Sequence, residues 1–344
     1  MKNLFTLAML FSVFITYAQD SIPASEEAPK KKFSVSGSAD AYFRQNLGAP
    51  NGSEAIAPAT SFANGNSFAL GMANVILAYE GTKVGAVVDL VYGPRGEEAV
   101  FGSLPSNNIV NQLYVYWNVS DKVTLTFGNF NTFLGYEVIS PTGNFNYSTS
   151  YMFSYGPFSH TGLKLDYAIN DDWSLMGAIM NDNDLTDFNP TNNYTLGAQV
   201  GFKGTYLNFL YGPQFQVDLT TGFDITDSFY LGLNSTYYVD NDSDASFYGV
   251  AIYPQLKTSE SFVLGFRAEY FGEGKGGVGA IGGYDDNGDA NAFEFTLSGN
   301  YAIGDLMIIP EFRIDTTSED TFVNDDFEPT GSLASFLIAA VYKF

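Results

Sequence analysis

Apolar and polar residues alternate along almost the whole chain, from Phe33 to its end. In one segment, for example, Phe293, Phe295 and Leu297 alternate with polar residues. A period of two is typical of β-strands with one apolar face, and clusters of Gly, Asn and Asp separate the segments as turns do. The pattern predicts an all-β protein with sixteen strands, which are 33–44, 67–79, 83–93, 109–119, 122–131, 160–169, 172–181, 193–203, 205–212, 215–224, 227–239, 246–256, 260–271, 291–302, 305–315 and 332–344.

The connections between these strands alternate in length. Even-numbered strands end in tight turns, such as Ser120-Asp121 and Asn170-Asp171, and odd-numbered strands end in longer loops, such as 132–159. Tight turns at one end and long loops at the other are typical of antiparallel barrels in bacterial outer membranes. A soluble β-sandwich also alternates, so the position of the aromatic residues has to distinguish the two.

Aromatic residues gather on the apolar faces close to the tight turns. Such amphipathic rings suit the level of the lipid headgroups, so the belt indicates that the apolar faces meet lipid. The belt consists of Tyr79, Trp117, Tyr167, Trp173, Phe202, Phe223, Phe229, Phe262, Tyr301 and Phe344. The sequence therefore predicts a transmembrane antiparallel outer-membrane β-barrel of about sixteen strands.

The opposite faces are rich in Ser, Thr, Asn, Gln and charged residues. These side chains are costly to bury in a dry core, and a barrel of sixteen strands is wide enough to enclose a water-filled channel. We therefore expect this face to line a pore, and for the same reason we expect Ser298 to tolerate a charged replacement. The candidate pore-lining residues are Asp40, Arg44, Asp89, Lys164, Asp166, Asp218, Arg267, Glu269, Glu294, Glu311 and Arg313.

The two ends of the chain carry features of export and assembly. Residues 1–18 have a positive start at Lys2, an apolar run and a small-residue cleavage site, which predict a secretory signal peptide. Residues 19–32 are expected to form a periplasmic lead-in, and residues 33–344 a single barrel domain. The last strand ends in Phe344 and resembles the signal that barrel-assembly machinery recognises. We expect the mature protein in the outer membrane of a Gram-negative bacterium.

Composition removes several other classes. The 344 residues include 38 acidic and 15 basic side chains, and the resulting net charge of −23 argues against binding nucleic acid. The chain has no cysteine, which excludes disulfides. His160 is the only histidine, and Ser159 is too close to it in sequence for a catalytic triad, so we expect no enzyme. The acidic clusters 240–244 and 285–289 do not match an EF-hand and are interpreted as turns. Nothing indicates a cofactor or a metal.

Short motifs in five segments resemble those of one family of barrels. They are 88–94 (VDLVYGP), 127–130 (FGNF), 134–137 (LGYE), 144–148 (NFNYS) and 160–162 (HTG). Together they resemble the OmpL-like β-barrel porin family, particularly as it is found in Bacteroidota. The resemblance spans most of the barrel and implies a general-diffusion or weakly selective pore, without naming a solute.

The longest predicted loop, 132–159, is strongly aromatic and has a single charged residue. A loop this apolar is not expected to lie in open water. Two interpretations are open: the loop folds into the lumen and narrows it, or it covers the rim or packs on a neighbouring subunit. For the first interpretation, the candidate constriction residues are Tyr136, Glu137, Asn144, Asn146 and Tyr147.

Taken together, these patterns predict a porin for passive diffusion of small hydrophilic solutes and ions. The long loops carry many acidic side chains and two basic ones, Arg95 and Lys275, so we expect a weak cation preference at the outer mouth. A plugged structural or adhesin-type barrel is the alternative. The expected partners are outer-membrane lipid, small solutes or ions, and the barrel-assembly machinery, while a homo-oligomer stays open.

Overall fold

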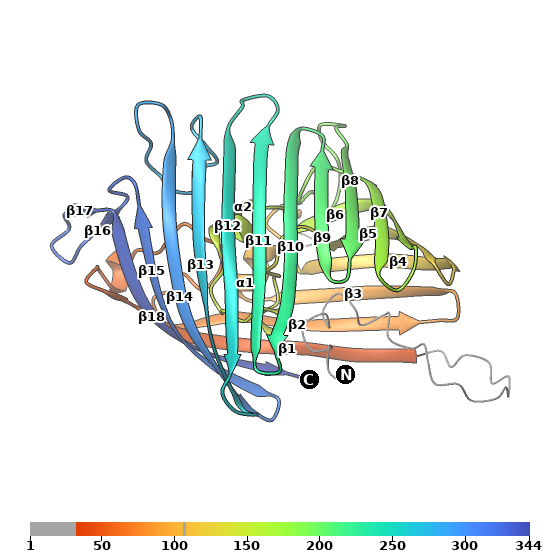
Figure 1. Cartoon of the computed structure of the whole chain (residues 1–344), viewed down its shortest axis with the longest axis horizontal. Helices are drawn as coiled ribbons and strands as arrows, with labels where there is room; N and C mark the ends of the chain where they lie inside the picture. The colour runs from red at the N-terminus through yellow and green to blue at the C-terminus, as the bar shows by residue number, and fades with distance from the viewer. Residues whose placement is uncertain (1–31, 106–107) are drawn as a thin grey trace.

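In the computed structural model, sixteen antiparallel strands form one closed barrel (Figure 1). The structure describes residues 32–105 and 108–344. The predicted signal peptide and residues 19–31 of the predicted lead-in lie outside the described residues. The barrel strands are β1 (Lys32–Leu47), β2 (Ser67–Glu80), β3 (Val84–Tyr92), β4 (Val110–Ser120), β5 (Val123–Asn131), β6 (Ser159–Ala168), β7 (Trp173–Met180), β8 (Thr195–Phe202), β9 (Thr205–Tyr211), β10 (Gln214–Thr226), β11 (Phe229–Asp240), β12 (Ser246–Lys257), β13 (Phe262–Gly274), β14 (Ala290–Ile303), β15 (Leu306–Thr317) and β18 (Ser332–Lys343).

The predicted fold class is confirmed. All sixteen strands lie where the alternation predicts them, with bounds that agree to within three residues. Short elements inside the long loops carry no period-two signal, and the sequence pattern does not reveal them. They are α1 (Pro94–Ala99), α2 (Tyr151–Tyr155), the 3-10 turns η2 (Gly52–Glu54) and η3 (Pro141–Gly143), and the ribbon of β16 (Phe322–Val323) and β17 (Pro329–Thr330).

Consecutive strands are neighbours in the barrel, and the ring closes where β1 pairs with β18. The chain end takes part in this closure, because the backbone of Phe344 exchanges two hydrogen bonds with Gly37, of 3.0 and 3.1 Å. A side chain at Gly37 would collide with the carbonyl oxygen of Asn74, at 2.2 Å from an added Cβ. Glycine therefore permits the close approach of β1 to β2, next to the seam.

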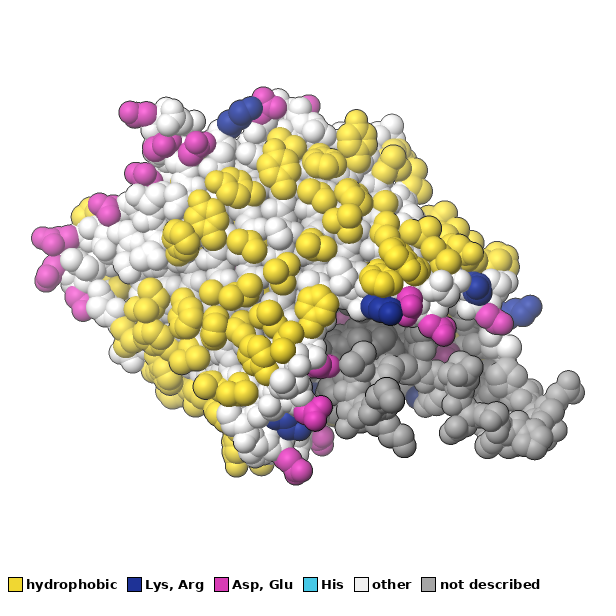
Figure 2. Space-filling model, viewed as in Figure 1, with side chains coloured by type: hydrophobic (Ala, Val, Ile, Leu, Met, Phe, Trp, Pro, Cys, Tyr) yellow, Lys and Arg dark blue, Asp and Glu magenta, His cyan; other side chains and the backbone are white. Residues whose placement is uncertain are grey.

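Each strand turns one set of side chains inward and the other outward. On β14, Glu294, Thr296 and Ser298 are buried, whereas Phe295 and Leu297 are exposed. Figure 2 shows the outward set as a broad hydrophobic band across this face of the barrel, with acidic side chains gathered at the rim above it. This distribution is the one that a hydrocarbon layer requires.

Exposed aromatic residues mark both edges of the band. Near the tight turns, Trp173 and Phe202 lie on paired strands with ring centroids 4.4 Å apart. Of the predicted belt, Phe229 and Phe262 are half-buried and the others are exposed. A second belt at the long-loop ends was not predicted from the sequence, and it includes Phe68, Tyr211, Tyr248 and Phe293. Two belts are typical of the two interfaces of a membrane barrel.

No helix among residues 32–105 and 108–344 is long and apolar enough to cross a membrane.

Two neighbouring residues on β8 test which face meets lipid. Ala198 points outward, midway along the strand, and Gln199 points inward, where its amide donates to Asn208 Oδ1 at 2.7 Å. We expect Ala198→Arg to cost about 2–4 kcal/mol of folding free energy, because an arginine at the bilayer midplane is poorly solvated. Denaturant titration of the barrel in lipid vesicles measures this cost.

Gln199→Arg is the matched control, since its side chain enters the polar interior. We expect its midpoint to stay close to that of the wild type. Equal losses for the two variants would contradict the assignment of the faces.

Candidate functional site

The loop between β5 and β6 lies inside the barrel. Its helix α2 contacts β12 and β13 from within (Figure 1). Ser150 is the N-cap of α2, because its hydroxyl accepts the Phe153 N–H at 3.1 Å. Tyr147 and Tyr151 are fully buried, which removes the apolar side chains of the loop from water. The structure thus corresponds to the first of the two interpretations of this loop, in which it enters the lumen.

Carboxylates on the wall hold the backbone of this loop. Glu269 on β13 accepts the Tyr151 and Met152 N–H groups, each at 2.8 Å. Glu311 on β15 accepts the Tyr147 N–H at 2.8 Å and the Ser148 N–H at 3.2 Å. These charge-assisted bonds satisfy both the buried carboxylates and the loop amides.

A third carboxylate, Asp218 on β10, fastens the start of the loop. It accepts the Gly135 N–H at 2.9 Å. Two side-chain amides of the neighbouring strands also donate to it, Asn208 at 2.9 Å and Asn234 at 2.6 Å. The loop is therefore attached to the wall at both of its ends.

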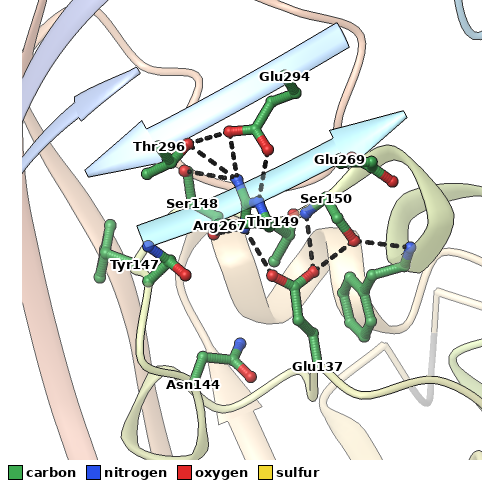
Figure 3. A network of polar contacts seen from close by, with 12 residues as sticks. Glu137, Asn144, Tyr147, Ser148, Thr149, Ser150, Arg267, Glu269, Glu294 and Thr296 are labelled. Carbon is green, nitrogen blue, oxygen red and sulfur yellow. Dashed lines mark hydrogen bonds and ion pairs between the residues drawn. The ribbon is translucent and has the colours of Figure 1, made fainter. Parts of the chain in front are cut away.

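Arg267 on β13 is the centre of the polar network (Figure 3). Its guanidinium forms ion pairs with Glu137 of the loop at 2.6 Å and with Glu294 of β14 at 2.8 Å. It also donates to the Ser148 carbonyl oxygen at 2.7 Å. The side chain is 0% exposed, so its charge is balanced entirely by the chain.

Glu137 connects this network to the helix. Its second oxygen accepts the Ser150 N–H at 2.8 Å and the Ser150 hydroxyl at 2.6 Å. The same hydroxyl group caps α2, so Arg267, Glu137 and the first turn of the helix form one connected unit.

Arg313 on β15 forms a second, adjoining unit. It pairs with Asp315 at 2.7 Å and donates to the Thr149 carbonyl oxygen at 2.9 Å. Its guanidinium also lies 3.8 Å from Glu294. Arg44 of β1, which is buried beside it in the same cavity, donates to the Ile56 carbonyl oxygen at 3.2 Å.

The candidate constriction residues all hold the loop in place. The ring of Tyr136 stacks on Tyr253 of β12 at 4.1 Å. Asn144 closes a turn inside the loop with two hydrogen bonds to the Val138 backbone, of 2.7 and 2.8 Å. Asn146 donates to the Ser298 hydroxyl at 2.8 Å, and Tyr147 donates its hydroxyl to Asp40 of β1.

The structure divides the candidate pore-lining residues into two groups. Eight of them contact the loop or the residues packed beside it. These are Asp40, Arg44, Asp218, Arg267, Glu269, Glu294, Glu311 and Arg313. Asp89 lies apart, where Asn111 and Asn74 donate to it at 2.7 and 3.1 Å. Lys164 and Asp166 on β6 form an ion pair of 3.2 Å that stays open to solvent, with the aspartate side chain 42% exposed.

Two expectations about solvent access are wrong. Ser298 is on the inward face, but it is fully buried between Asn146 and Glu311, so it has no room for a charged replacement. Arg95 is not a charge of the outer mouth. It is buried beneath the loop, where it donates to the Ile139 carbonyl oxygen at 2.7 Å and lies over the ring of Phe62.

Glu273, one of the acidic residues of the predicted long loops, is also buried. Its carboxylate accepts backbone N–H groups of the loop that follows β13, from Val278 at 2.7 Å and from Ile281 at 2.9 Å. An alternation pattern places a residue on one face of a strand, but it does not show which loop will cover that face.

The acidic clusters and the histidine have structural partners. Asp285 closes its turn by accepting the Asn287 and Asp289 N–H groups, and these bonds hold the pKa of its carboxyl below the usual value. Within the described parts of the chain, no group of three acidic or histidine side chains is arranged to hold a metal. His160 is buried beside Phe133 and contacts the Thr132 hydroxyl at 3.0 Å.

These features define a porin-type barrel of the outer membrane. The chain belongs to the family described as "Putative beta-barrel porin-2, OmpL-like", whose model matches residues 32–344. The resemblance inferred from the short motifs is thereby confirmed. None of the curated proteins compared with the chain matches it.

Several solved structures are similar to this barrel. OmpT of Vibrio cholerae, expressed in the outer membrane, has 12% sequence identity and a TM-score of 0.54, covering 92% of this chain and 99% of that one. An anion-selective porin from Comamonas acidovorans has 8% identity and a TM-score of 0.52, covering 92% and 100%. A trimer form of V. cholerae OmpT has 11% identity and a TM-score of 0.51, covering 91% and 99%. At these identities the likeness shows a shared fold.

Removing the central arginine tests the network. We expect Arg267→Met to destabilise the barrel by about 3–5 kcal/mol, because it leaves buried Glu137 and Glu294 without their counter-charge. Lys164→Met is the control, since it breaks an ion pair that is partly open to solvent, and exposed pairs are worth about 0–1 kcal/mol. Denaturant midpoints of the barrel in lipid vesicles compare the two. A loss for Arg267→Met no larger than for the control would show that the network does not hold the loop.

Proposed function

We propose that the protein is a passive porin for small hydrophilic solutes and ions. The observation that supports this most strongly is the uneven burial of the inner wall. The loop covers inward side chains of β1, β10 and β13 to β15, whereas the side chains of Lys164 and Asp166 on β6 stay partly open to water. We infer that the loop narrows the lumen and that solutes pass along the β6 side.

Family membership favours a channel over an enzyme. The similar barrels include one whose name states that it is anion-selective, so this fold does not by itself determine the sign of the preferred ion. The sign depends on the side chains that solutes meet.

We infer a weak preference for cations. The inward charges near the loop are buried and held by ion pairs or by neutral hydrogen-bond donors, so we expect a passing ion to meet mainly the charges that stay in water. Outer-rim carboxylates such as Asp320, Asp325 and Asp326 are exposed. Lys275, the remaining exposed base among the long loops, is itself paired with Asp244 at 3.2 Å. A mouth of one sign raises the local concentration of counter-ions, within a screening length of about 8 Å at physiological salt.

A plugged structural barrel is the second candidate. It is favoured by the complete burial of Tyr147 and Tyr151, which shows how tightly the loop fills its side of the lumen. Liposome swelling separates the two candidates, since a plugged barrel admits no sugar.

Assembly is part of the proposal. The trimer form of the V. cholerae barrel supports a homo-oligomer. The pairing of Phe344 with Gly37 at the seam supports recognition of the last strand by barrel-assembly machinery. Residues 1–18 would direct export as a signal peptide.

Reversal potentials under a KCl gradient test the selectivity. We expect a modest cation preference at about 0.1 M salt that weakens toward 1 M, where the screening length falls to about 3 Å. Neutralising Asp320, Asp325, Asp326 and Glu328 together to their amides is expected to reduce it.

Replacing the three aspartates of this set by glutamate is the control, because it alters the same loop and keeps the charge. An anion preference at low salt would overturn the inference. A cation preference that survives neutralisation would show that these loops do not set it.

A further inference from the structure

A cavity of about 400 Å³ opens where four of the long loops meet. Ser61 comes from the loop after β1, Glu98 from α1, Tyr155 and Phe158 from the loop after β5, and Asp184 from the loop after β7. The volume lies in the range of cavities that bind small molecules. The cavity is separate from the Arg267 network and lies at the long-loop end of the barrel.

Its lining combines two carboxylates with aromatic rings and contains no basic side chain. Phe101 is 66% exposed and meets the ring of Phe158 edge-on at 5.9 Å. Phe158 in turn stacks on Phe62 at 5.6 Å, which holds the aromatic side of the cavity rigid. Aromatic faces attract cations as well as apolar groups.

The two carboxylates are positioned but not neutralised. Asp184 uses its Oδ1 to accept the Phe158 and Ser159 N–H groups at 2.7 and 2.9 Å, and the described residues supply no donor to its Oδ2. Both oxygens of Glu98 accept the single N–H of Phe62, at 3.1 and 3.2 Å, and the Ser61 side chain also donates to this carboxylate. Each carboxylate is thus fixed by the backbone and keeps acceptor capacity.

The pKa values of Glu98 and Asp184 are both raised, which indicates that the cavity lacks enough positive charge to balance its carboxylates. Burial raises the pKa of Glu98, and the hydrogen bond from the Phe62 N–H, the charge of Arg95 and the hydrogen bond from Ser61 only partly offset this. Burial, together with the charge of Asp182, raises the pKa of Asp184 to about 7. A cation bound beside either carboxylate would favour the charged form of that group.

We propose that this cavity binds a small organic ammonium ion, with the ammonium group beside the carboxylates that line it and the apolar part against Phe101 and Phe158. This inference rests on the proposed porin function, because only a porin would use the site in solute uptake. Binding itself requires only the four loops and is measured independently of transport.

Calorimetry on the detergent-solubilised barrel tests the proposal, with phenethylammonium chloride as the probe and 2-phenylethanol as its neutral match. We expect the alcohol to bind at least tenfold more weakly, because it lacks the charge. Asp184→Asn keeps the acceptor for Phe158 and Ser159, and we expect it to weaken ammonium binding about tenfold. Asp286→Asn, an exposed carboxylate on another loop, is the control and is expected to change nothing.

Phe101→Ala provides a variant that leaves the buried structure intact, and we expect it also to weaken binding. Equal affinity for the ammonium and the alcohol would overturn the proposal, as would affinities unchanged by Asp184→Asn and Phe101→Ala. Competition by glucose or Ca²⁺ at the same residues would assign the cavity to another ligand class and overturn it too.

Conductance measured on the same preparations separates the two proposals. A barrel that binds the probe but conducts no ions refutes the porin function and leaves the binding site. A barrel that conducts but does not bind refutes the site alone.

Discussion

Charges buried inside the barrel must be balanced inside it. Arg267 illustrates the constraint, because its guanidinium has no access to water and is held between Glu137 of the loop and Glu294 of the wall. A buried ion without a partner costs several kcal/mol. The loop supplies the missing partners through its amides and its one carboxylate, and the wall in turn covers the aromatic side chains of the loop. Each part therefore depends on the other for the partners of its buried polar groups.

Because of this mutual dependence, the buried charges of the barrel have a different role from the charges that remain in water. Carboxylates such as Glu269 and Glu311 face inward, yet their oxygens are occupied by loop N–H groups and serve mainly to fix the shape of the lumen. Under the proposed function, the charges that would act on passing ions are those that remain in water, on the β6 side and at the outer rim. The residues that fix the shape of the lumen and those proposed to set its selectivity are therefore different.

The strands could be predicted because each obeys a local rule that adjacent residues reveal. The site could be predicted only in part. Glu137 stands out as the single charge of an apolar loop, but its partner Arg267 is 130 residues away, and no local pattern connects them. Arg95 looks like a surface charge in sequence, and only the folded loop buries it. Ser298 has the predicted orientation but not the predicted contact with water. The alternation of a strand shows which way a side chain points, but not which residues lie next to it.

The position of the loop in the lumen is the central claim, and single-channel conductance tests it most directly. The wild-type barrel is compared in planar bilayers with a variant in which residues 138–147 are replaced by a short Gly-Ser linker. The account predicts a small but discrete conductance for the wild type and a clearly larger one for the variant. Equal conductance of the two barrels would contradict a loop that narrows the pore.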